Sequence, residues 1–197
     1  MIENIFESEP FAPFQRWFAL AAQREELAET MTLATATLDG RPSLRAVLLK
    51  SVDQQGFVFY TNLESRKSSE LFVNPHAALC FHWKSLKRQV RAEGVAEQVS
   101  EDEADAYYAT RPRGSQIAAW SSDQSRPLES REQLERRVEM FTRRFADRSA
   151  IPRPNFWSGF RLVPERIEFW QDQPSRLHDR LVFVHDGESW RRERLFP

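Results

Sequence analysis

Residues 45–67 read RAVLLKSVDQQGFVFYTNLESRK, and this stretch decides the fold. Residues 45–50 alternate between two faces, with Val47 and Leu49 on one and Ala46, Leu48 and Lys50 on the other, which indicates a strand. The sequence Asp53-Gln54-Gln55-Gly56 is typical of a turn, since glycine accepts a positive φ without strain. Residues 57–61 are aromatic and β-branched, which favours a second strand. The stretch therefore predicts a β-hairpin.

A helix is expected directly after this hairpin, running to about Val73. Asn62 and Ser65 are candidate N-caps for it, because both side chains can accept from free N–H groups of a first turn. The basic residues of the stretch then lie at strand ends or beside the helix N-terminus; they are Arg45, Lys50, Arg66 and Lys67. A helix N-terminus with adjacent cations suits a phosphate group. The alternative is a solvated hairpin edge with protective charges.

The composition is that of an ordinary globular protein of one domain. The chain has 197 residues, 41% of them hydrophobic, with a formal net charge of −1. A balanced charge gives no global attraction to nucleic acid or to an anionic membrane, so any anion site must be local. The single Cys80 excludes an intrachain disulfide and a cysteine-based zinc site. We expect a cytoplasmic protein, since the sequence has neither a membrane-length apolar run nor a signal segment.

The rest of the chain extends the hairpin into a mainly β, α+β fold. Further strands are predicted at residues 30–38, 77–83, 89–99, 160–170, 180–185 and 190–195. Helices are predicted at residues 13–29, 100–111, 114–121 and 130–148. Short connections between the early strands favour an antiparallel sheet curled into a Greek-key-like barrel. Residues 1–12 are expected to form an N-terminal arm, and residues 13–197 one domain.

A second candidate anion site lies where the third predicted helix ends. Tyr107 and Arg111 are four residues apart and share a helix face, and Ser115 is placed to cap the next helix. Together with Lys50 they form a set that suits a second phosphate. An arginine at a helix end is also common because it complements the helix dipole, so the structural interpretation stays open.

A third candidate set follows Trp170. If residues 176–180 are extended, Arg176, His178 and Arg180 point the same way and suit an anionic ligand. The alternative is a charged edge strand. The other histidines, His76, His82 and His185, lack metal-ligand spacing, so no metal site is expected.

Seven short motifs connect these candidate sites. They are RAVLLK (45–50), FYTN with SRK (59–62 and 65–67), RQV (88–90), RPRGSQ (111–116), QS (124–125), IEFW (167–170) and RLHDR (176–180). In this order and spacing, residues 13–197 resemble the pyridoxine/pyridoxamine 5′-phosphate oxidase family. The resemblance implies a split β-barrel that binds FMN and forms a homodimer with FMN at the subunit interface. It also implies oxidation of pyridoxine or pyridoxamine phosphate to pyridoxal phosphate, with O2 reduced to hydrogen peroxide and ammonia released from the amine.

The resemblance carries residue roles to matching positions. The implied FMN site is Arg45, Ala46, Val47, Leu48, Leu49, Lys50, Tyr60, Thr61, Arg66, Lys67, Gln89, Gln124, Ser125, Trp170 and Arg180. The implied substrate site is Lys50, Tyr107, Arg111, Ser115, Arg176, Leu177 and His178. Of these, Arg176 and His178 are the implied catalytic pair, which would cover the substrate ring opposite the flavin.

The start of the chain departs from the family pattern. Some members carry a longer, basic arm that closes over the substrate, whereas residues 1–12 here are acidic and aromatic. Two other functions remain open: a related flavin oxidase of the phenazine type, and a non-catalytic protein that binds FMN or pyridoxal phosphate. A purely structural module would not need so many basic residues in register.

Overall fold

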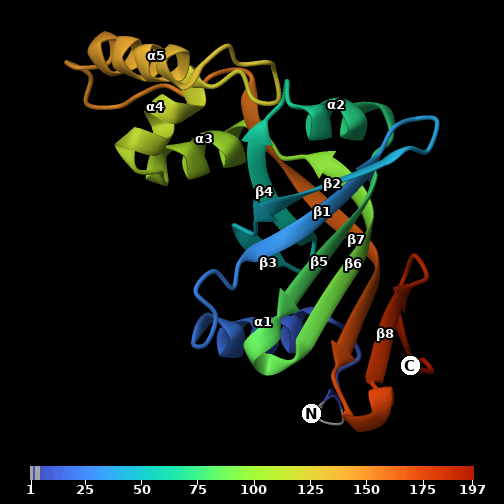
Figure 1. The fold of residues 1–197 in the computed structure, drawn as a ribbon. Coiled ribbons are helices and arrows are strands. Elements are labelled where there is room, and N and C mark those ends of the chain that lie inside the picture. Colours follow the sequence, from blue (N-terminus) through green and yellow to red (C-terminus); the bar gives the residue numbers. More distant parts are fainter. Residues whose placement is uncertain (1, 3–4) are drawn as a thin grey trace.

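The computed structural model describes residues 2 and 5–197. In this part of the chain the strands form one nine-stranded antiparallel sheet (Figure 1). The strands are β1 (Thr30–Ala36), β2 (Pro42–Leu48), β3 (Ser51–Asp53), β4 (Gly56–Asn62), β5 (His76–Trp83), β6 (Arg88–Gln98), β7 (Trp157–Gln171), β8 (Asp179–His185) and β9 (Trp190–Arg194). The helices are α1 (Phe11–Ala22), α2 (Arg66–Val73), α3 (Glu101–Thr110), α4 (Arg113–Ser121) and α5 (Arg131–Arg144). The short 3-10 turns are η2 (Lys84–Leu86) and η3 (Pro174–Arg176).

The sheet curls into a split barrel because β2 and β3 belong to opposite edges of the strand order β2-β1-β5-β6-β7-β4-β3. The two strands are nearly continuous in sequence and are separated at Leu49 and Lys50. The N–H of Leu49 donates to Glu29 O beside β1, whereas the N–H of Lys50 donates to Val58 O in β4. Successive N–H groups of an extended chain point in opposite directions, so this segment joins the two edges of the sheet. The predicted barrel is therefore confirmed.

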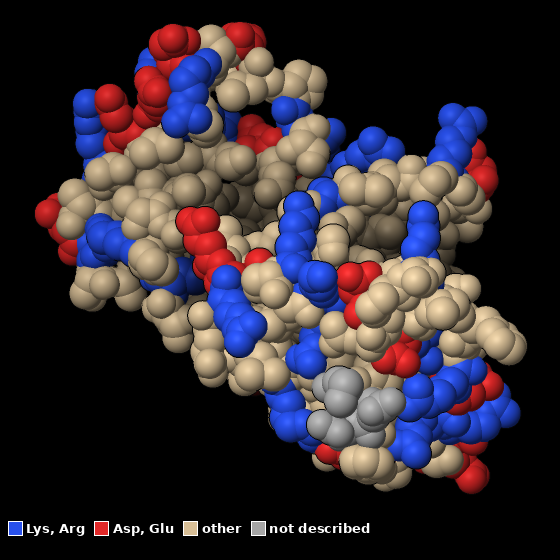
Figure 2. All heavy atoms as spheres, turned by 60° about the horizontal axis from the view of Figure 1, so that its bottom comes forward, with Lys and Arg blue, Asp and Glu red and all other residues tan. Residues whose placement is uncertain are grey.

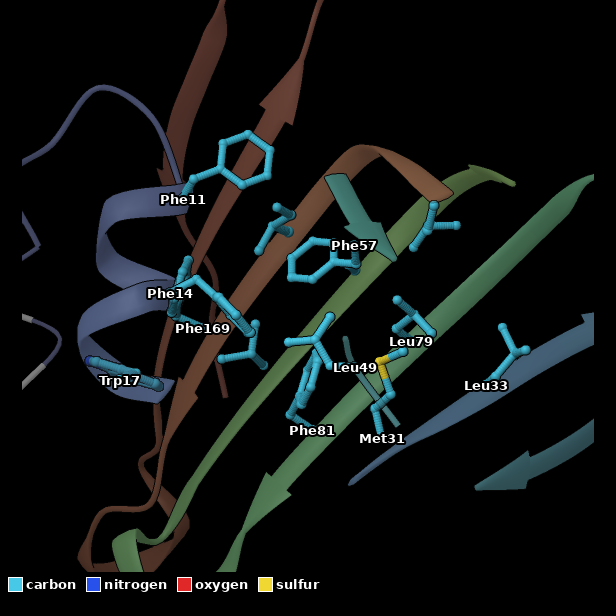
Figure 3. Close-up of a cluster of buried hydrophobic side chains, with 14 of the residues drawn as sticks. Phe11, Phe14, Trp17, Met31, Leu33, Leu49, Phe57, Leu79, Phe81 and Phe169 are labelled. Carbon is cyan, nitrogen blue, oxygen red and sulfur yellow. The ribbon is translucent and has the colours of Figure 1, made fainter. Parts of the chain in front are cut away.

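A large aromatic core fills the barrel under α1. Phe14 packs edge-on against Phe57 and Phe81, with ring centroids 5.0 and 5.1 Å away, and Trp17 packs edge-on against Phe169 at 5.2 Å. Figure 3 shows these α1 side chains pointing at the strands. Full burial of one such aromatic contributes roughly 1.5–3 kcal/mol, so this cluster makes a large contribution to folding.

The boundaries of several predicted elements were wrong. The first helix ends at Ala22 rather than Glu29, because the apolar stripe stops at Ala21 and Leu27 is left exposed. The helix predicted over 130–148 ends at Arg144, and only Phe141 and Phe145 of its apolar side are buried. The predicted strand at residues 45–50 begins at Pro42 and stops at Leu48, where the sheet changes edges.

The turn predicted at residues 53–56 is confirmed, and two other turns of the chain also place a glycine at positive φ. Gly40, Gly56 and Gly187 all have positive φ, at 82°, 139° and 101°. In the turn at residues 53–56, Asp53 Oδ1 accepts hydrogen bonds from the N–H groups of Gln55 and Gly56 at 2.8 and 3.2 Å. This aspartate fixes the hairpin that begins β4.

Part of the segment predicted as an N-terminal arm packs against the barrel. Ile2 and Ile5 are buried in the main core, and Phe11 already belongs to α1. Residues 1, 3 and 4 of this segment lie outside the described residues. On the face drawn in Figure 2, basic and acidic side chains are interspersed, as the balanced charge predicts. Among the described residues, no helix is both long and apolar enough to cross a membrane.

Candidate functional site

The candidate site is a cavity of about 730 Å³ between β2, β4 and the helices α2, α3 and α4. This volume falls within the roughly 300–1,000 Å³ usual for a cofactor or substrate site. Its lining includes thirteen of the predicted site residues: Arg45, Ala46, Val47, Leu48, Lys50, Tyr60, Thr61, Arg66, Lys67, Tyr107, Arg111, Gln124 and Ser125. Five of the thirteen carry a permanent or titratable positive charge, so the cavity is suited to an anionic ligand.

The first cationic set of the cavity is centred on Lys67. It lies in the first turn of α2, and its Nζ donates to Thr61 Oγ1 at 2.9 Å, Gln124 Oε1 at 2.8 Å and Ser65 Oγ at 3.1 Å. Burial, and then the nearby charge of Arg45, lowers the pKa of Lys67 to about 8. Among the described residues no carboxylate bonds to this ammonium, so its charge is available to an incoming anion. Ser65 is the N-cap of α2, as one of the two predicted candidates.

The second cationic set contains Arg111 and a stack of aromatic rings. Tyr60 and Tyr107 are stacked with centroids 3.9 Å apart, and Tyr60 is stacked on Trp157 at 5.4 Å. The guanidinium of Arg111 lies 4.7 Å from the centroid of Trp157. Burial lowers the pKa of Arg111, and its Nη1 is buried without a hydrogen-bond partner among the described residues. A buried donor without a partner is costly, and an anionic ligand would satisfy it.

Two predicted residues near the cavity are not part of its lining. Leu49 points into the main core, although its backbone continues the strand that borders the cavity. Ser115 was expected to cap the next helix, and this is wrong: α4 begins at Arg113, with Pro112 at the N-cap. Ser115 therefore lies within the first turn of α4.

The remaining predicted residues gather at a second place, on β6, β7, β8 and η3. Gln89 is paired with Trp170, and Trp170 with Arg180, across adjacent strands. The ring centroids of Trp170 and His178 are 4.6 Å apart. Arg180 donates through Nε and Nη2 to the two carboxylate oxygens of Glu168, at 2.8 and 3.0 Å. This pair fixes the direction of the Arg180 side chain.

The segment around Arg176 is not extended, so the predicted alignment of Arg176, His178 and Arg180 is wrong. Residues 174–176 form the 3-10 turn η3, in which Ser175 and Arg176 have φ of 59° and 62°. This turn leaves Arg176 and Leu177 exposed, Leu177 by 69%. Two consecutive non-glycine residues at positive φ are strained, and strain of this kind is often found at ligand sites.

The two groups of predicted residues lie at opposite ends of one strand. Trp157 begins β7 at the cavity, and Trp170 is near its other end (Figure 1). At about 3.3 Å per residue, the stretch of β7 from Trp157 to Trp170 spans on the order of 40 Å. One chain therefore does not place both groups on the same small ligand.

The cavity also has lining residues that the sequence did not single out. They are Ser43, Leu44, Asn62, Ala118, Ala119, Ser122 and Trp157. Ser43 had a usable signal, because it alternates onto the same strand face as Arg45. Trp157 had none, since nothing local indicates that the start of β7 reaches the helix carrying Tyr107.

Two protein-family models match the chain. The model described as pyridoxamine 5′-phosphate oxidase matches residues 20–144, and the model described as the pyridoxine 5′-phosphate oxidase C-terminal dimerisation region matches residues 157–197. The chain belongs to the pyridoxine/pyridoxamine 5′-phosphate oxidase family. The cavity lies largely in the first matched region, and the group around Trp170 lies in the second.

Curated members of this family match along the whole chain. The pyridoxine/pyridoxamine 5′-phosphate oxidase of Rhodospirillum rubrum is 56% identical, with 100% of both chains covered. That of Rubrobacter xylanophilus is also 56% identical, covering 100% of this chain and 91% of its own. Among solved structures, PhzG from Burkholderia lata, in complex with tetrahydrophenazine-1-carboxylic acid, matches with a TM-score of 0.92 at 34% identity. That match covers 98% of this chain and 95% of PhzG.

Proposed function

We propose that this protein oxidises pyridoxine 5′-phosphate and pyridoxamine 5′-phosphate to pyridoxal 5′-phosphate with FMN as cofactor. Molecular oxygen is the final acceptor and leaves as hydrogen peroxide, and the amine substrate also releases ammonia. This reaction serves vitamin B6 salvage and pyridoxal phosphate synthesis. The proposal rests mainly on one observation: two cationic sets, one around Lys67 and one around Arg111, line the same cavity. Two phosphate-bearing molecules fit such a cavity side by side.

The residues present fit FMN. Arg66 and Lys67 stand at the start of α2, where free N–H groups and the helix dipole add to their charge, so they are assigned to the phosphate. The backbone of residues 45–50 borders the same cavity and is assigned to the flavin ring, with Tyr60, Thr61, Gln124 and Ser125. When bound, FMN supplies a two-electron acceptor that oxygen can reoxidise.

The second cationic set is assigned to the substrate phosphate. Arg111, Tyr107 and Lys50 line the cavity, and the unpartnered Nη1 of Arg111 gives the phosphate a donor that the protein does not satisfy. Anchoring the substrate at its phosphate fixes the other end of the ring against the flavin, and such alignment is a large part of rate enhancement. Ser115, one turn into α4, keeps its assignment to this set.

The protein is a homodimer, and the partner subunit is assigned the other side of the site. The proposed contributions of the partner are those of Gln89, Trp170, Arg176, Leu177, His178 and Arg180. Arg176 is exposed in one chain, as a residue that reaches across an interface would be. We assign Arg176 to positioning the substrate and stabilising charge, with His178 beside it. An Arg176→Ala variant that lost only a few-fold in rate and affinity would contradict this role.

Three measurements test the function against its alternatives. The purified protein should be yellow, and anaerobic addition of pyridoxine phosphate should bleach it; a colourless protein would contradict the cofactor, and an unbleached one the reaction. A non-catalytic binding protein would release no hydrogen peroxide with either substrate. A phenazine-type oxidase, suggested by the PhzG match, would not need the substrate phosphate. Turnover of pyridoxamine phosphate should therefore far exceed that of unphosphorylated pyridoxamine.

We further propose that the enzyme works in the cytoplasm, where its phosphorylated substrates would be retained by their charge. Fractionation of cells that produce the protein would test it, and recovery with the membrane pellet would contradict it.

A further inference from the structure

A buried carboxylate lies directly behind the proposed phosphate site. Glu70, on α2, has a side chain only 6% exposed, yet it is ionised: burial alone would raise its pKa, but hydrogen bonds from Ser43, Thr35 and Arg66 lower it to about 2. Its Oε2 accepts from Ser43 Oγ and Thr35 Oγ1, both at 2.5 Å. Neither family model nor the resemblance gives this residue a role.

The same carboxylate binds two of the cations assigned to FMN. Arg66 Nε donates to Glu70 Oε1 at 2.9 Å, and Arg45 Nη2 lies 3.3 Å from Glu70 Oε2. Arg45 is held further by Thr35 Oγ1 and Ser43 Oγ, each at 2.5 Å. Glu70 therefore connects β1, β2 and α2 through side chains that all point to one wall of the cavity.

The bond to Arg66 has a particular geometry. It uses Nε, the inner nitrogen of the guanidinium, and the described residues offer no partner to the two terminal nitrogens. The Arg66 side chain is 65% exposed, so its terminal fork faces the cavity and not the protein. A planar guanidinium fixed at Nε presents two parallel donors, which match two oxygens of a phosphate.

A purely structural ion pair would have a different arrangement. It would satisfy both partners fully, and burial of such a pair often contributes little net stability. Here the carboxylate is saturated with donors and Arg45 is fully bonded, while Arg66, the other arginine partner, keeps its terminal donors free of partners among the described residues. An ionised buried group that consumes hydrogen bonds without satisfying its partner is better explained by preorganisation of a site.

We propose that Glu70 is a positioning residue for the FMN phosphate: it holds Arg66 by Nε and Arg45 by Nη2, so that the phosphate site is formed before the cofactor arrives. The inference rests on the proposed FMN site. It assigns Glu70 no contact with FMN itself, because a carboxylate next to a phosphate would be repelled.

The test compares FMN with riboflavin, which lacks the phosphate, by fluorescence titration of the full-length protein stripped of flavin. Glu70→Ala should weaken FMN binding by about tenfold or more, since charge-assisted bonds to the phosphate are lost, and should change riboflavin binding less than about twofold. Glu70→Gln keeps an acceptor oxygen and should hold FMN affinity within about threefold of wild type. The exposed Glu64, just before α2, provides the control: Glu64→Ala removes the same charge and should leave the FMN-to-riboflavin ratio unchanged.

A second variant covers the case that Glu70→Ala does not fold. Arg66→Lys keeps the positive charge at an exposed side chain. A lysine lacks the Nε that Glu70 binds and the two parallel donors that would bind the phosphate, so FMN affinity should fall while riboflavin affinity is unchanged. Adding Glu70→Gln to Arg66→Lys should cause no further loss, because both act through one contact.

The inference is overturned if Glu70→Ala weakens FMN and riboflavin equally, if it leaves FMN binding unchanged, or if Arg66→Lys binds FMN like wild type. Failure of the proposed function would look different. In that case the wild-type protein itself would show no preference for FMN over riboflavin, or would bind neither.

Discussion

Lys67 is a buried cation, and its protonation should control FMN binding. Its pKa in the free protein is lowered to about 8, so near pH 7 it is charged and ready for the phosphate. Above pH 8 it must take up a proton when it binds FMN, and affinity should fall by up to about tenfold per pH unit until the pKa of the complex is reached. FMN dissociation constants measured between pH 7 and 9.5 would show this decline, which Lys67→Arg should abolish. A flat wild-type profile would contradict the assignment.

Protein stability should respond to Lys67 in the opposite direction. The group binds a proton less well in the folded chain than in the unfolded chain, where a lysine has its ordinary pKa of about 10.4. Between these two values the unfolded chain holds more protons, so folding stability from this group rises with pH. The free energy of unfolding of flavin-free protein can be measured with urea at several pH values above 8. It should rise more steeply with pH in wild type than in Lys67→Met. Equal slopes would contradict the lowered pKa.

Arg111 should act on the substrate and not on the cofactor. Its buried Nη1 has no hydrogen-bond partner in the part of the chain that the structure describes, and truncation removes a charge-assisted contact to the phosphate worth roughly 1.5–3 kcal/mol. Arg111→Ala should therefore raise the KM for pyridoxine phosphate by about tenfold to a hundredfold, with the yellow FMN spectrum retained. Arg136→Ala, an exposed arginine on α5, serves as the control and should keep wild-type kinetics. Loss of FMN from the Arg111 variant would contradict the division into two phosphate sites.

Single residues were the most predictable part of the candidate site. Thirteen predicted residues line one cavity, because their motifs fall on strands β2 and β4 and on helix ends whose positions the sequence reveals. The position of Arg176 was not predictable. Its turn depends on two consecutive non-glycine residues at positive φ, which is a conformation that local sequence disfavours.

Among the elements, β6 and β7 approach each other so closely that one glycine is required. A Cβ on Gly94 would lie 2.0 Å from Val163 O, at the irregular register opposite Pro164. Gly94→Ala should therefore destabilise the protein by about 1–3 kcal/mol, as expected for overpacking against backbone. Gly114→Ala is the matched control, since a Cβ there meets nothing within 4 Å and the residue is helical. That variant should be neutral or slightly more stable. Urea unfolding of both would decide, and equal midpoints would contradict the packing argument.

The sequence predicted whether each element is a helix or a strand better than it predicted where the element begins and ends. Strands were predicted where β5 and β6 lie, and their Leu79, Phe81, Val90 and Ala92 are buried. Periodicity could not show that the strand through residue 48 leaves one edge of the sheet and joins the other at Lys50, since both halves alternate alike. Closure of the barrel depends on tertiary contacts between distant strands, and it places the backbone of residues 45–50 beside the cavity.

At the scale of the whole molecule, the length of β7 makes the site depend on two chains. The cavity residues and the group around Trp170 are separated by on the order of 40 Å of strand in one chain. We propose that the two-fold dimer brings the Trp170 end of one chain to the cavity of the other, which would form two equivalent sites. Each site then needs Arg111 from one subunit and Arg176 from its partner.

This arrangement predicts complementation between two defective variants. Assayed with pyridoxine phosphate well below the raised KM, Arg111→Ala and Arg176→Ala should each show little activity alone, because both sites of each homodimer are damaged. In a mixed dimer one site carries both substitutions and the other carries neither, so co-expression at equal levels should restore about one quarter of wild-type activity. Co-expression of Arg111→Ala with Lys50→Ala is the control, since both residues line the same cavity and no site in their mixed dimer is intact. If the first pair gave no recovery, or the second pair recovered as much, each site would have to be built from one chain, and the separation along β7 would have no functional meaning.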